Sequence, residues 1–69
     1  MSEGEFSVVE FYDDGTHAYV ERWLDAEHAV KLAAKLAQQQ RDSVDRIIIT
    51  DGGDFTVFEW TKGKGVTFK

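Results

Sequence analysis

Hydrophobic and polar residues alternate on both sides of a short acidic segment in the first third of the chain. Residues 5–12 and 16–24 are rich in aromatic and β-branched residues, and Asp13-Asp14-Gly15 connects them. A three-residue connection that ends in glycine is typical of a β-hairpin with a bulged turn, because its last residue needs a positive φ. In the register that pairs Tyr12 with Thr16, the facing residues are Phe6 and Arg22, Val8 and Val20, Val9 and Tyr19, Glu10 and Ala18, and Phe11 and His17.

The same alternation returns in the second half of the chain. Residues 44–50 and 54–61 are again rich in β-branched and aromatic residues, and they flank Gly52-Gly53. Two glycines between such runs predict a hairpin with a two-residue turn. This register places Arg46 opposite Glu59, and an opposite-charge pair across two strands supports it.

Between the two hairpins, hydrophobic residues recur at steps of three and four. Residues 26–41 contain neither glycine nor proline, so their helix propensity is high. Asp25 is a suitable N-cap residue, and Glu27 falls in the first turn, where the helix dipole favours negative charge. So many alanines on one side predict a helix that lies close against a sheet. The predicted buried stripe consists of Ala26, Ala29, Val30, Ala33, Leu36 and Ala37, with Leu32 beside it.

Together these elements predict a single α+β domain over residues 1–69. The expected order is β-β-α-β-β, with Val66-Thr67-Phe68 as a candidate fifth strand. We expect an antiparallel sheet of four or five strands with one helix packed across one face.

A single helix covers only one face of such a sheet, and the other face is normally polar. In this chain both sets of alternating residues are apolar. One set holds Phe6, Val8, Tyr12, Ala18, Val20 and Leu24, continued by Ile47, Ile49, Phe58 and Trp60. The other set holds Val9, Phe11, Tyr19 and Trp23, continued by Val44, Ile48, Phe55 and Val57.

Whichever set packs under the helix, the other set predicts an aromatic interaction surface, and Val9, Phe11, Tyr19 and Trp23 are the candidate contact residues. Three explanations remain open at this point. The surface binds a second copy of the chain, it binds a different protein, or strand twist and the C-terminal strand cover it. Direct nucleic-acid binding is not expected, because the neighbouring carboxylates would repel phosphates.

The charge of the chain is unevenly distributed and adds a second candidate surface. The first 27 residues hold eight of the 13 acidic residues and one of the eight basic residues, in a chain with a net charge of −5. A surface of one sign attracts complementary partners from a distance. The candidate acidic contact residues for a protein partner are Glu10, Asp13, Asp14, Glu21, Asp25 and Glu27.

No group of residues has the pattern of a catalytic, cofactor-binding or metal site. His17 and His28 are not at metal-ligand spacing and have no nucleophile close by in sequence. The segment 51–54 lacks the terminal glutamate of a calcium-binding loop, and Gly63-Lys64-Gly65 lacks the strand–loop–helix context of a phosphate loop. The chain has no cysteine, which excludes disulfides. We therefore expect a non-enzymatic protein without cofactor or bound metal.

The sequence also shows no membrane-binding or export pattern. Its longest apolar run is Ile47-Ile48-Ile49, far from the roughly 20 residues of a membrane span, and its N-terminus does not look like a signal peptide. A cytoplasmic protein without membrane partners is the expectation.

The predicted element order, with Asp25, Ala29 and Ala33 at the helix entry, resembles several small phage- and plasmid-borne families of unknown function. In size, acidity and lack of catalytic motif, the chain is also similar to phage-encoded inhibitors, above all anti-CRISPR proteins. This second resemblance implies a stoichiometric inhibitor that binds a CRISPR effector and blocks its DNA site or its assembly, and it assigns no residue. The hypothesis is thus an acidic inhibitor of a nucleic-acid-binding protein; the alternative is a homodimeric structural or regulatory module that pairs through its open sheet face.

Overall fold

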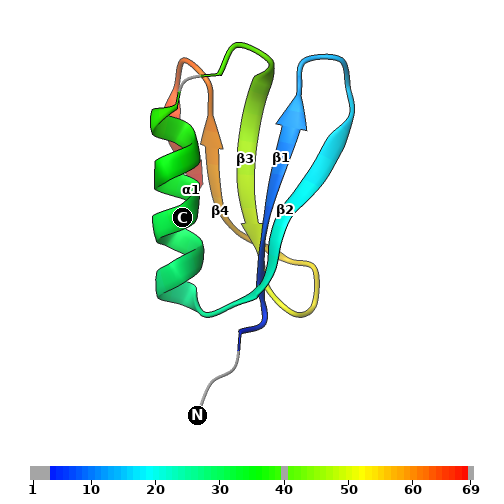
Figure 1. Cartoon of the computed structure of the whole chain (residues 1–69), viewed down its shortest axis with the longest axis vertical. Helices are drawn as coiled ribbons and strands as arrows, with labels where there is room; N and C mark the ends of the chain where they lie inside the picture. Colours follow the sequence, from blue (N-terminus) through cyan, green and yellow to red (C-terminus); the bar gives the residue numbers. More distant parts are fainter. Residues whose placement is uncertain (1–3, 40, 69) are drawn as a thin grey trace.

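The computed structural model describes residues 4–39 and 41–68 and confirms the α+β prediction. Five strands form one antiparallel sheet in the order β2-β1-β3-β4-β5, and a single helix packs across one face of it (Figure 1). The candidate fifth strand is present at one edge of the sheet. The elements are β1 (Phe6–Tyr12), β2 (His17–Leu24), α1 (Ala26–Gln38), β3 (Val44–Thr50), β4 (Thr56–Thr61) and β5 (Gly65–Phe68).

The first turn forms as predicted. Gly15 has a φ of +92°, and the Tyr12 amide donates a hydrogen bond of 2.8 Å to the Thr16 carbonyl. Next to the turn, the facing pairs also agree with the prediction, with Phe11 opposite His17 and Val9 opposite Tyr19.

Farther from the turn, the predicted register is wrong by up to two residues. Val8 faces Glu21 instead of Val20, and Phe6 faces Leu24 instead of Arg22. Two irregularities in the pairing of β1 with β2 cause this shift, because each inserts an extra residue into β2.

The predicted register of the second hairpin is also wrong by two residues. Arg46 faces Thr61, and Glu59 faces Ile48. The reason is a wider turn: the Asp51 carboxylate accepts hydrogen bonds from the amides of Gly53, at 2.9 Å, and Phe55, at 3.0 Å, and so closes a five-residue loop. Arg46 and Glu59 still form an ion pair of 3.2 Å, diagonally across the two strands.

Helix α1 begins at the predicted cap. The Asp25 carboxylate accepts a hydrogen bond of 2.8 Å from the His28 amide. Ala29 and Ala33 are buried against the sheet, as predicted. Ala26 and Val30 are exposed, so their predicted place in the buried stripe was wrong. Val30 lies about 100° around the helix from Ala29, outside the narrow side that touches the sheet.

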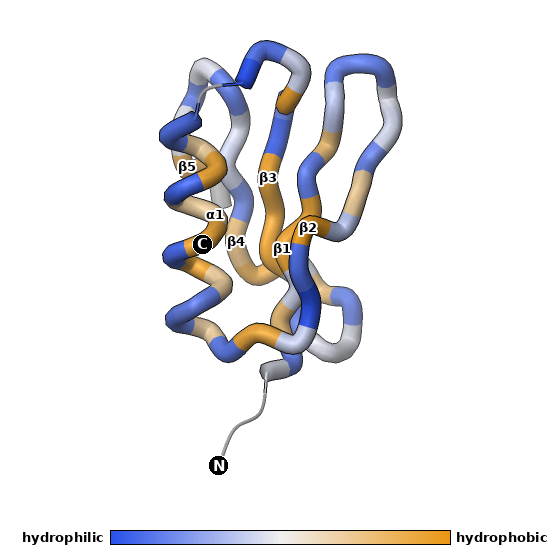
Figure 2. The backbone as a smooth tube through the Cα atoms, viewed as in Figure 1, coloured by the Kyte–Doolittle hydropathy of each residue, from blue (hydrophilic) through white to orange (hydrophobic). Residues whose placement is uncertain are grey.

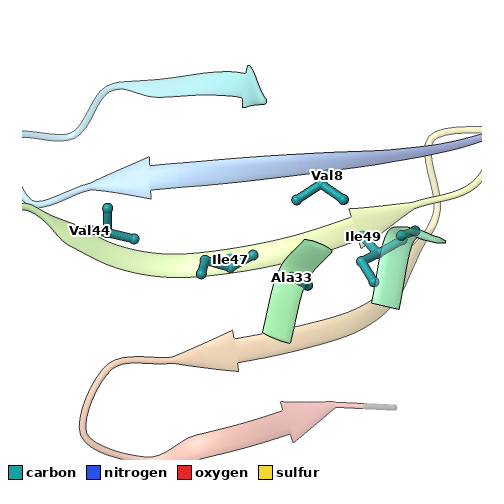
Figure 3. Close-up of a cluster of buried hydrophobic side chains, with 6 residues drawn as sticks. Val8, Ala33, Val44, Ile47 and Ile49 are labelled. Carbon is teal, nitrogen blue, oxygen red and sulfur yellow. The ribbon is translucent and has the colours of Figure 1, made fainter. Parts of the chain in front are cut away.

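The helix covers the set of strand residues that includes Val8, Ile47 and Ile49, and these form the core with Ala29 and Ala33 (Figure 3). Figure 2 shows the contrast between this hydrophobic centre and the hydrophilic β1–β2 turn. Around the core lie the partly buried residues Phe6, Tyr12, Val20, Leu24, Leu32, Leu36, Ala37, Phe58 and Trp60.

Val44 belongs to this core, so its predicted place on the opposite face was wrong. Phe11 pairs with Arg46 and the next residue, Tyr12, pairs with Val44, which leaves Asp45 as an extra residue that turns Val44 toward the helix.

No helix in the described part of the chain is long and apolar enough to cross a membrane.

Candidate protein-binding face of the sheet

The sheet face opposite α1, called the open face below, has a covered half and an exposed half. The covered half lies toward the β1–β2 turn. There the Arg46 guanidinium lies 4.5 Å above the Phe11 ring centre, and the His17 ring stacks on Phe11 at 5.3 Å. Arg46 is in turn held by its ion pair with Glu59.

Because the Arg46 and His17 side chains lie against Phe11, the aromatic surface expected from the sequence is only partly accessible. Val9 is 2% exposed and cannot offer its side chain to a partner, while Phe11 is half-buried. Of the four predicted aromatic-face residues, Tyr19 and Trp23 remain as accessible contacts, with exposed fractions of 44% and 78%.

The exposed half of the face lies where β2 runs toward α1 and where the β3–β4 loop closes, at the end opposite the β1–β2 turn (Figure 1). Here the Arg22 guanidinium lies 4.3 Å above the Tyr19 ring centre. Phe55, in the neighbouring loop, is also largely exposed. We call Tyr19, Arg22 and Trp23 the aromatic–arginine patch.

Trp23 is held in an unusual backbone conformation. Its φ is +62°, in the left-handed region of backbone conformation that residues with a Cβ atom rarely adopt. The backbone of Gly4 lies so close to Trp23 that a Cβ atom at position 4 would overlap the Trp23 carbonyl group. A large apolar side chain on a strained backbone, turned mostly to solvent, contributes little to the fold, and such outliers cluster at functional sites.

A small cavity of about 140 Å³ lies beside the patch. Its walls include Tyr19, Arg22 and Trp23, together with the carboxylates of Glu5, Asp51 and Asp54. A wider hollow of about 510 Å³ lies toward the β1–β2 turn, but its walls include Arg46 and Glu59, which neutralise each other.

The six acidic residues singled out from the sequence do not form one cluster. Glu10 is 3% exposed, because it points to the helix-covered side of β1; it forms an ion pair with Arg41 and accepts a hydrogen bond of 2.9 Å from the Tyr12 hydroxyl. It therefore does not belong to an accessible acidic surface.

The remaining five acidic residues are exposed or half-buried along the edge strand β2 and at both of its ends. Asp13 and Asp14 lie in the β1–β2 turn, Glu21 lies within β2, and Asp25 and Glu27 lie at the start of α1. Since β2 advances about 3.3 Å per residue, the two ends are separated by about 25 Å. This arrangement is a line of charge along one edge.

Two of these carboxylates are used in local structure, which lowers their pKa values. Hydrogen bonds from the Thr16 hydroxyl, at 2.6 Å, and the Thr16 amide lower the pKa of Asp14. The hydrogen bond from the His28 amide, followed by the His28 ring at 2.7 Å, lowers the pKa of Asp25. Glu27 forms an ion pair of 3.1 Å with Lys31.

Both histidines are engaged in local contacts. His17 contacts the rings of Phe11 and Tyr19, the latter edge-on at 6.3 Å, and His28 is engaged with the helix cap. Within residues 4–39 and 41–68, no group of three or more His, Asp or Glu side chains is placed to hold a metal ion.

Sequence reasoning missed Arg22, Glu5, Asp51 and Asp54 as members of this site. The predicted register places Arg22 opposite Phe6 and so on the other face from Tyr19 and Trp23, because the bulge around Trp23 leaves no signal in the hydrophobic pattern. The loop residues Asp51 and Asp54 were interpreted only as turn residues.

A comparison of the chain with known protein families, curated proteins and solved structures found no match.

Proposed function

We propose that the protein is a non-enzymatic protein-binding module whose contact surface is the aromatic–arginine patch. The observation that supports this most is Trp23, a large apolar side chain that is 78% exposed on a strained backbone. Tryptophan, tyrosine and arginine are the residue types most enriched among the residues that dominate binding energies at protein interfaces. All three stand together here, on a regular strand and its bulge.

The charge of the protein favours a basic partner. The net charge is −5; acidic residues line the cavity beside the patch, and others lie within β2, at Glu21, and at both of its ends. Complementary charge raises the rate of association, while the buried aromatic contacts slow dissociation. In the narrower form of the proposal, the basic partner surface is a nucleic-acid-binding groove, and the protein is an inhibitor of the anti-CRISPR kind.

The same charge opposes the alternative in which two copies pair through their open faces. Face-to-face pairing would bring the carboxylates near Trp23 of both copies into one interface, where like charges repel. Sedimentation equilibrium at physiological salt distinguishes the two. We expect the monomer mass of 7.8 kDa; twice that mass, lost on substitution of Trp23, would replace the proposal with the homodimer.

The proposal is tested by capture with matched variants. Tagged wild-type protein, Trp23→Gly and Val66→Thr are immobilised and exposed to lysate of the cells in which the protein acts. Val66 is a suitable control because it is half-exposed on β5, at the sheet edge opposite β2. We expect a partner that is held by the wild type and by Val66→Thr and is missing from Trp23→Gly.

The narrower form needs two further measurements on that partner. Excess duplex DNA or single-stranded RNA should displace the partner from the wild-type protein if both use the same groove. Binding should also weaken as the salt concentration rises, because salt screens exposed charges. A partner that Trp23→Gly retains as well as the wild type does would refute the proposal altogether.

A further inference from the structure

The cavity beside Trp23 shows which part of a basic partner the patch is built to take. It lies at the end of the open face, between the bulge of β2 and the β3–β4 loop. Its volume of about 140 Å³ suits a single side-chain head group rather than a small-molecule ligand of drug size. It is open to solvent beside the most exposed aromatic side chain among the described residues.

Carboxylates determine the sign of the charge that this cavity favours. Three of them, Glu5, Asp51 and Asp54, line it, against the one guanidinium of Arg22. Asp51 is fixed by the two amide hydrogen bonds that close the loop, and the Glu5 carboxylate lies against Gly52. In the part of the chain that the structure describes, neither Glu5 nor Asp54 forms an ion pair. The cavity therefore retains an excess of negative charge.

The aromatic walls favour a planar cation over a compact one. Arg22 already shows that the Tyr19 ring accepts a guanidinium, at 4.3 Å from its centre. Indole is the aromatic ring that attracts cations most strongly, and the Trp23 indole is mostly exposed to solvent. A guanidinium combines stacking on such a ring with paired hydrogen bonds to a carboxylate, which an ammonium group cannot do.

We propose that this cavity binds an arginine side chain of the partner protein, stacked on Trp23 and paired with the carboxylates of Glu5 and Asp54. This inference rests on the proposed function and names the side chain of the partner that the cavity binds. A phosphate or other anion is disfavoured by the three carboxylates. The aromatic walls distinguish the cavity from the acidic positions along β2.

The probe for this proposal is the peptide acetyl-Gly-Arg-Gly-amide, titrated into the ¹⁵N-labelled protein and followed by NMR. Peptides with lysine or citrulline in place of arginine are the matched probes, since citrulline keeps the shape of arginine and lacks its charge. We expect millimolar binding of the arginine peptide, weaker binding of the lysine peptide, and none of the citrulline peptide. The shifted signals should be the Trp23 indole N–H and the amides of Gly52 and Asp54.

Charge variants show whether the cavity itself is responsible. Glu5→Gln and Asp54→Asn should each weaken the binding of the arginine peptide by about 1.4- to fivefold, the range that exposed ion pairs of about 0.2–1 kcal/mol give. Asp42→Asn removes one exposed negative charge from the segment between α1 and β3, outside the cavity, and should leave the affinity unchanged. Equal binding of arginine and citrulline peptides, shifts outside the cavity, or no effect of Asp54→Asn would overturn the inference.

These outcomes separate the inference from the proposed function. If the arginine peptide fails to bind while Trp23→Gly still loses its protein partner, the cavity proposal fails and the protein-binding proposal stands. If the peptide binds in the cavity but Trp23→Gly keeps the partner, the cavity recognises arginine and the proposed contact surface is wrong.

Discussion

The ion pair between Glu10 and Arg41 joins the sheet to the segment that follows α1, and its removal is the most informative stability test. The Glu10 side chain is 4% exposed, whereas Arg41 is 41% exposed. Replacing Arg41 with methionine keeps most of the side-chain length but leaves the carboxylate without its cation. The Tyr12 hydroxyl, at 2.9 Å, would then be its remaining partner among the described side chains.

The expected cost follows from the burial of the two partners. Breaking a fully buried ion pair by removing one partner costs about 3–5 kcal/mol. Because water reaches the Arg41 side of this pair, we expect the lower part of that range or somewhat less, about 2–3 kcal/mol. A domain of this length has a total stability of about 3–10 kcal/mol, so the loss is a large fraction of it. The melting temperature should fall by about 8–24 °C.

Urea denaturation followed by circular dichroism at neutral pH measures this cost. The double variant Glu10→Gln/Arg41→Met should be more stable than Arg41→Met alone, because a neutral amide is less costly to bury than an unpaired carboxylate. Lys35→Met removes an exposed positive charge from the last turn of α1 and serves as the control. An Arg41→Met protein within about 0.5 kcal/mol of the wild type, in the range of ordinary surface substitutions, would refute the reasoning.

Three further predictions concern the backbone and the helix cap. Gly4→Ala should destabilise the fold by about 1–3 kcal/mol in the same assay, because the new methyl group would meet the Trp23 carbonyl; an unchanged midpoint would contradict this contact. The free energy of unfolding of Trp23→Gly should stay within about 1 kcal/mol of the wild-type value. Glycine loses the contacts of the indole and gives the unfolded chain more freedom, but it adopts the positive φ at position 23 without strain, and these effects offset each other. The pKa of Asp25 is lower in the folded protein than its ordinary value of 3.8, so the ionised carboxylate stabilises the fold at pH values above 3.8. This contribution is lost as the pH falls through the folded-state pKa. Asp25→Ser keeps a cap that does not titrate, so the wild type's advantage over it should shrink in acid; a constant difference from pH 7 to pH 3 would contradict the role of the carboxylate.

The sequence predicts those parts of the fold that depend on local chemistry. Gly15 adopts the positive φ that the first turn needs, and Asp25 caps α1, because each preference acts between residues close in the chain. The alternation of apolar residues likewise predicts the strands and the helix-covered sheet. It does not reveal the irregularities: the extra residues around Trp23 and the loop closed by Asp51 shift both hairpin registers. Such details depend on the competition between turn closure and packing across the whole sheet.

The candidate site shows the same division. Tyr19 and Trp23 were predicted as exposed aromatics from strand alternation, which fixes the face on which a side chain lies. Alternation does not say how much of that face other side chains cover, so the burial of Val9 beneath its neighbours was not foreseen. Glu10 illustrates the reverse case: its charge predicts a place on the surface, but it alternates in step with Val8 and is buried with it on the helix-covered side.

The central claim is that the aromatic–arginine patch holds a protein partner, and the affinity of the purified partner for Trp23→Gly tests it most directly. Biolayer interferometry would compare wild type, Trp23→Gly and Val66→Thr at one salt concentration, after thermal melts show that all three are folded. Loss of a central interface tryptophan typically costs at least about 2 kcal/mol of binding free energy, which raises the dissociation constant about 30-fold. We expect that loss for Trp23→Gly, chiefly as faster dissociation, and no change for Val66→Thr. Equal affinities of wild type and Trp23→Gly would contradict the account.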